Sequence, residues 1–169
     1  MARLNLTFDA RLFHSQLPEL VGLARARPEA TIVLDHLGGP LGIGPYAGRR
    51  DEVLSELRSS LVGVAACDNV VLKLGGVGMT VFGLRWHKRD ERPSSDEVVD
   101  AWGPTIRWCI ELFGPNRCMF ESNFPVDRHS LDYAVLWNAF KQMTADASAT
   151  ERAALFHDTA ARVYRLDDA

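Results

Sequence analysis

Short runs of β-branched and aliphatic residues alternate along this chain with longer segments of helical periodicity, and this alternation constrains the fold most strongly. The apolar runs predict strands over residues 3–9, 31–36, 69–74 and 118–122. The helical spacing predicts helices over 16–27, about 50–66, 98–113, about 131–143 and about 150–164. Strands and helices in this order predict parallel strands joined by right-handed crossovers, and therefore an α/β fold.

Two segments interrupt this regular pattern. Gly103-Pro104 lies within the 98–113 helical pattern and predicts two helical pieces there rather than one. Residues 77–94 form a long irregular stretch, which in a compact domain is usually functional or disordered. We expect one domain over residues 1–169, with four strand–helix units. A (β/α)8 barrel typically needs about 250 residues, so this chain has the residues for about half of one, and a small open doubly wound sheet fits the length better.

Composition excludes several classes of function. The chain has 19 Lys and Arg against 22 Asp and Glu, which argues against a nucleic-acid partner. Its apolar runs are too short to span a membrane, and its first residues have no signal-peptide pattern. Three cysteines in apolar surroundings, Cys67, Cys109 and Cys118, are expected to be buried and reduced. Together these features predict a cytoplasmic protein.

Polar residues gather where the predicted strands end. Aspartate, histidine, lysine and glutamate side chains occupy these ends: Asp9, Asp35-His36, Lys73 and Glu121-Ser-Asn123. In a parallel α/β fold the carboxyl ends of the strands meet at one edge, where ligands bind. Because each such group costs free energy when it is buried unpaired, their convergence predicts a functional site.

Each candidate residue has a chemical and a structural interpretation. His36 could bind a metal or carry a proton, or it could cap the loop that follows its strand. Lys73 could bind an anionic substrate, or it could pair with a structural carboxylate. Glu121, Asn123 and Asp127 cluster after the fourth strand, where Asp127 could manage a proton or serve as the N-cap of the next helix.

Four ordered segments resemble the amidohydrolase-2 (amidohydrolase-related) family. They are residues 31–40 (TIVLDHLGGP), 69–76 (NVVLKLGG), 113–125 (FGPNRCMFESNFP) and 156–166 (FHDTAARVYRL). The resemblance implies a (β/α)8 barrel of which this chain supplies about the C-terminal half. It also implies a hydrolase that acts on a lactone, ester or amide bond of a small carboxylated substrate.

The resemblance also implies roles for the strand-end residues. His36 would bind a divalent metal such as zinc or polarise the carbonyl, Lys73 would neutralise charge on the substrate, and the Glu121 to Asp127 segment would manage the proton. Two features depart from the family pattern. No His-x-His pair matches the metal-binding pair of the family's first strand, and Asn123 stands where most members have an aspartate. An asparagine side chain cannot act as a general base.

Three other functions stay open on the sequence. Four strands cannot close an eight-stranded barrel, so the chain could be an inactive half-barrel that forms homo-oligomers through its sheet edges. Decarboxylation, which the family also includes, is a second alternative. The third is a nucleotide-binding module based on Gly42-x-Gly44-x-x-Ala47, a weak match to the dinucleotide fingerprint.

Overall fold

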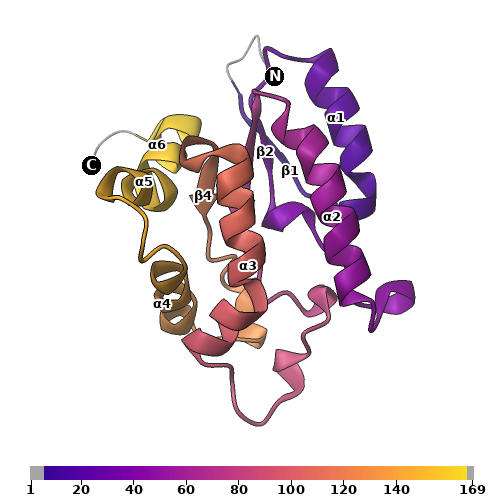
Figure 1. The fold of residues 1–169 in the computed structure, drawn as a ribbon, viewed down its shortest axis with the longest axis vertical. Coiled ribbons are helices and arrows are strands. Elements are labelled where there is room, and N and C mark those ends of the chain that lie inside the picture. The colour runs from indigo at the N-terminus through magenta and orange to yellow at the C-terminus, as the bar shows by residue number, and fades with distance from the viewer. Residues whose placement is uncertain (1–5, 167–169) are drawn as a thin grey trace.

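The computed structural model describes residues 6–166 and has an α/β fold (Figure 1). The strands are β1 (Phe8–Ala10), β2 (Ile32–Leu34), β3 (Val70–Leu74) and β4 (Cys118–Phe120). The helices are α1 (Leu17–Ala26), α2 (Arg50–Ala65), α3 (Ser95–Phe113), α4 (Tyr133–Met143), α5 (Ala149–Ala153) and α6 (Thr159–Tyr164). A π-helical stretch over 154–158 joins α5 to α6.

The four strands form one parallel sheet in the order β1-β2-β3-β4. This confirms the predicted α/β class with parallel strands. One face of the sheet carries Leu34 and Leu72, which belong to the main core with Leu57 of α2 and Trp102 of α3. These side chains are fully buried. Removing their apolar surface from water makes the largest favourable contribution to the free energy of folding.

The opposite face of the sheet has a smaller apolar cluster. Val33, Val71 and Met119 come from the three strands β2 to β4, and Val163 of α6 packs on them. Side chains alternate between the two faces of a strand, so Lys73 projects from the same face as Val71. The C-terminal helix therefore covers the face of the sheet that carries this lysine.

The predicted break at Gly103-Pro104 is wrong, because α3 runs without interruption from Ser95 to Phe113. Pro104 removes the amide that would donate to the carbonyl of Asp100. Pro104 and Asp100 both lie on the exposed face of α3, so water can solvate that carbonyl. The buried side chains of Trp102 and Ile106 on the other face hold the helix together across the proline.

The remaining element predictions agree with the structure within a few residues, with strands shorter than the predicted runs. Residues 3–5 of the predicted first strand lie outside the described residues. The segment over 77–94 is irregular as predicted, with short 3-10 turns at 80–82 and 86–88. At the start of α5, the hydroxyl of Ser148 accepts a hydrogen bond from the amide of Glu151.

The three cysteines are buried and free, as predicted. Burial raises the pKa of Cys109 to about 12, which keeps the thiol protonated and unreactive at neutral pH. Among the helices of residues 6–166, none has the length and apolarity needed to cross a membrane.

Candidate active site

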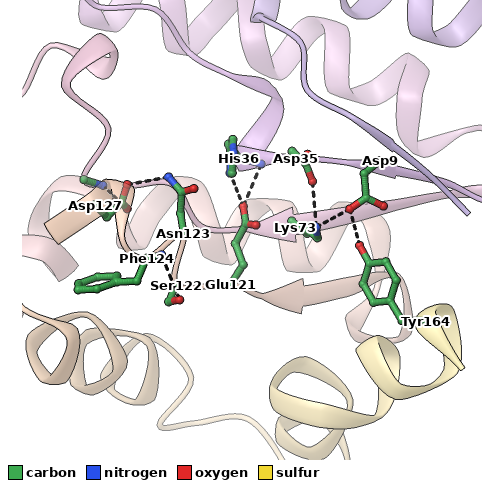
Figure 2. Close-up of polar contacts among 11 residues, drawn as sticks. Asp9, Asp35, His36, Lys73, Glu121, Ser122, Asn123, Phe124, Asp127 and Tyr164 are labelled. Carbon is green, nitrogen blue, oxygen red and sulfur yellow. Dashed lines mark hydrogen bonds and ion pairs between the residues drawn. The ribbon is translucent and has the colours of Figure 1, made fainter. Parts of the chain in front are cut away.

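The predicted strand-end residues form three neighbouring polar groups at the carboxyl ends of the strands (Figure 2). His36 follows β2 directly after Asp35, and Glu121 follows β4. Because β3 lies between β2 and β4, the side chains of His36 and Glu121 meet across the end of the middle strand. The structure thus brings together residues that are 85 positions apart in the chain.

His36 and Glu121 form a hydrogen-bonded dyad. Oε1 of Glu121 accepts from Nδ1 of the His36 ring at 2.5 Å and from the backbone N–H of His36 at 3.2 Å. A carboxylate can only accept, so the neutral imidazole carries its proton on Nδ1 and leaves Nε2 as an unprotonated acceptor. The two side chains are only 13% and 16% exposed, which limits competition from water.

Glycines in the loop after β3 make room for this dyad. Gly76 has φ +67°, and a Cβ added there would lie 2.9 Å from the ring of His36. A Cβ on Gly75 would lie 2.2 Å from Cγ of Glu121. The Gly75-Gly76 pair therefore permits a backbone approach to both members of the dyad that any larger residue would prevent.

Asp127 is fully buried and forms a second group with the partly buried Asn123. Its Oδ1 accepts from the side-chain amide of Asn123 at 2.8 Å, and its Oδ2 accepts from the backbone N–H of Gly78 at 2.8 Å. Burial raises the pKa of Asp127 to about 6, against the lowering effect of these two hydrogen bonds. The N-cap alternative for Asp127 is wrong, because Asp132 occupies the N-cap of α4 and Asp127 lies in the preceding 3-10 turn.

Lys73 lies in an ion-paired network beside the dyad. Its Nζ lies 2.7 Å from Oδ2 of Asp9 and 3.2 Å from Oδ1 of Asp35, and it approaches the ring of Tyr164. Burial alone would lower the pKa of Lys73, but these partners raise it well above its ordinary value. Lys73 is therefore a permanent cation with structural carboxylate partners, and its role in substrate binding stays a prediction.

Sequence reasoning did not find two members of these groups. Tyr164 lies on α6, far from any strand end, and its hydroxyl donates to Asp9 at 2.8 Å. Gly78 contributes only its backbone N–H, for which the sequence has no side-chain signal. The glycine segment over 42–47 packs against the 77–94 stretch, where a Cβ on Gly42 would lie 2.3 Å from the carbonyl oxygen of Phe82. That packing accounts for the small residue at position 42 without a nucleotide.

Polar residues at the carboxyl ends of a parallel α/β sheet are typical of the active sites of α/β enzymes. Comparison with known proteins identifies the family. A family model described as amidohydrolase matches residues 1–166. The chain belongs to the amidohydrolase-2 family.

Individual relatives agree with this assignment. The chain is 36% identical over 167 residues to the uncharacterized protein y4mH of Sinorhizobium fredii, covering 98% of this chain and 49% of that protein. It is 30% identical over 162 residues to an L-fucono-1,5-lactonase of Burkholderia multivorans, covering 95% of this chain and 52% of that enzyme. The chain thus spans about half the length of the curated relatives it matches.

A solved structure supports the same fold. The crystal structure of an amidohydrolase from Burkholderia multivorans with bound zinc superposes with a TM-score of 0.82 at 28% identity. The superposition covers 98% of this chain and 56% of that one. The fold is therefore the α/β barrel type predicted from the sequence, with four parallel strands in this chain.

The described residues do not form a zinc site by themselves. Within residues 6–166, no group of three His, Cys, Asp or Glu side chains is placed to hold a metal ion. Glu121 already pairs with Nδ1 of His36, and both oxygens of Asp127 accept hydrogen bonds, so His36 would reach a metal through Nε2. Zinc usually needs three or more protein ligands. Metal binding at His36 stays a prediction.

Proposed function

We propose that this protein hydrolyses the ring ester of a small lactone, with His36 as the general base. The observation that carries this proposal is the His36–Glu121 dyad, whose hydrogen bond directs the proton of the neutral imidazole to Nδ1 and leaves Nε2 as the acceptor. Membership of the amidohydrolase-2 family and the similarity to an L-fucono-1,5-lactonase support the choice of a lactone.

In the proposed reaction, Nε2 of His36 takes a proton from a water molecule as the water oxygen attacks the lactone carbonyl carbon. The C–O bond of the ring then breaks, and the ring oxygen receives the proton and becomes a hydroxyl group. Glu121 holds the imidazole in the required tautomer and stabilises the imidazolium that forms. The product is a hydroxy acid.

The test is a panel of aldono-1,5-lactones and aldono-1,4-lactones incubated with the protein at its full encoded length. Ring opening is followed by acid release. We expect hydrolysis above the buffer rate, and His36→Ala should lower kcat/KM by about 10²-fold or more. His87→Ala is the matched control, because His87 is exposed on the 77–94 stretch. The proposal is wrong if no lactone is hydrolysed or if His36→Ala is as active as the parent.

A further inference from the structure

Asp127 connects two loops of the candidate site through hydrogen bonds to its buried carboxylate. Its carboxylate accepts from the backbone N–H of Gly78 in the loop after β3 and from the side-chain amide of Asn123 in the loop after β4. The same turn is closed by the backbone N–H of Asp127, which donates to the carbonyl of Asn123 at 3.1 Å. Asp127 is 0% exposed, so it does not contact a substrate directly.

This contact determines which way the Asn123 amide faces. The carboxylate of Asp127 is an acceptor, so the NH2 group of Asn123 must face it and the Oδ1 atom must face the other way. Figure 2 shows the amide nitrogen of Asn123 on the side of Asp127 and its oxygen on the opposite side. Within residues 6–166, no donor is paired with that oxygen. The site therefore presents a fixed hydrogen-bond acceptor.

The groups next to Oδ1 of Asn123 favour a hydroxyl donor over a carboxylate at that atom. Asp9, Asp35, Glu121 and Asp127 are carboxylates, against the single ammonium group of Lys73. Lys73 is already paired with two of them. A substrate carboxylate next to Oδ1 of Asn123 would be unfavourable, because both groups are hydrogen-bond acceptors. A substrate hydroxyl group would instead donate a hydrogen bond to Oδ1.

We infer that Asp127 is a positioning residue that fixes the Asn123 amide, and that the substrate donates a hydroxyl hydrogen bond to Oδ1 of Asn123. The inference rests on the proposed function, and it specifies the substrate as a hydroxyl-bearing lactone, with a hydroxyl group rather than a carboxylate at Asn123. Asn123 makes the contact, and Asp127 acts only through Asn123.

The decisive variant is Asp127→Asn. Its oxygen can still accept from Gly78, but its NH2 group would face the NH2 group of Asn123. Two donors cannot pair, so the Asn123 amide should rotate and present its NH2 group to the substrate. The double variant Asn123→Asp/Asp127→Asn restores a complementary pair and again places an oxygen toward the site. Asp132→Asn is the matched control, because Asp132 is exposed and pairs with Arg92.

The kinetic measurement compares the best lactone of the panel with its monodeoxy counterparts, one for each ring hydroxyl. For one hydroxyl, the parent protein should prefer the hydroxylated lactone by about tenfold or more in kcat/KM, the equivalent of one lost hydrogen bond. Asp127→Asn should abolish this preference, and the double variant should restore it. A purely structural role for Asp127 would lower all rates without changing the preference.

A second measurement does not depend on activity or on the variant's folding. In the parent protein, the side-chain NH2 group of Asn123 should exchange slowly with solvent by NMR, because it faces the buried Asp127. Fast exchange of that group, or an Asp127→Asn variant that keeps the preference for the hydroxylated lactone, overturns the inference and leaves lactone hydrolysis standing. Failure of every lactone overturns the proposed function, while the exchange rate still decides the orientation of the amide.

Discussion

Gly76 is the residue that most directly determines the space available to His36. Its φ of +67° and the 2.9 Å approach of an added Cβ to the imidazole are two separate constraints. We expect Gly76→Ala to destabilise the protein by about 2 kcal/mol more than Gly48→Ala, because it adds overpacking to the backbone cost. Gly48 is the matched control, with φ +74° and no atom within 4 Å of an added Cβ.

Urea unfolding of both glycine variants measures this difference. The His36 imidazole should also shift its NMR signals in Gly76→Ala and stay unchanged in Gly48→Ala. Equal unfolding free energies for the two variants would mean that the loop relaxes away from His36, and that the close approach is not a constraint.

Asp127 makes the stability of the protein depend on pH. Its pKa is about 6 in the folded state and near 3.8 when exposed, so the folded state binds the proton more tightly. Its contribution is therefore most favourable below pH 4, declines as pH rises to about 6 and is constant above that. The total change is about 3 kcal/mol. The measurement compares the unfolding free energies of the parent protein and Asp127→Asn across this pH range. The contribution of Asp127 to the decline in unfolding free energy should be absent from the variant. A decline of equal size in both proteins would contradict the assignment.

The helix α6 is attached to β1 by side chains from opposite ends of the described chain. The hydroxyl of Tyr164 donates to Asp9 at 2.8 Å, and burial raises the pKa of Tyr164 to about 12. We expect Tyr164→Phe to lower the free energy of unfolding by about 1 kcal/mol, the usual value of one hydrogen bond. Tyr133→Phe should change it little, because Tyr133 is 54% exposed and its hydroxyl has no hydrogen-bond partner within residues 6–166. A denaturant titration that ranks the two variants equally would contradict this.

The elements were largely predictable because their apolar patterns are long. The spacing of buried residues along α2 predicted its bounds within one residue of Arg50–Ala65. α3 was predicted less well, because the effect of Pro104 depends on which face of the helix meets solvent, and a local sequence pattern does not determine that.

The membership of the candidate site was predictable, but its contacts were not. His36 and Glu121 were both expected at strand ends, because polar residues follow apolar runs there. Their direct pairing depends on the sheet order, which places only one strand between β2 and β4. The buried position of Asp127 depends on the turn over 123–130, whose hydrogen bonds leave no periodic signal in the sequence.

The edge of the sheet at β1 is unpaired within residues 6–166. β1 pairs only with β2 there, and a groove beside it is lined by apolar side chains that include Leu20 and the 41% exposed Leu23. An open strand edge beside exposed apolar surface favours association. We propose that the 169-residue chain forms homo-oligomers through this edge.

Sedimentation over a concentration series tests this proposal. Leu23→Glu should shift the chain toward the monomer, because it places a charge in the groove. Val62→Glu is the matched control, since Val62 is 53% exposed on α2, and it should leave association unchanged. A chain that is monomeric at every concentration, or two variants that behave alike, would contradict association through β1.

The dyad spans β3 and joins segments 85 residues apart, which has a consequence for how the protein matures. Closing so long a loop is among the costlier and later steps of folding. Until β4 pairs with β3, His36 lacks the Glu121 carboxylate that fixes its tautomer. In a nascent or partly opened chain, the imidazole of His36 is therefore not oriented. In the proposed reaction, His36 would therefore act as an oriented base only after the sheet is complete.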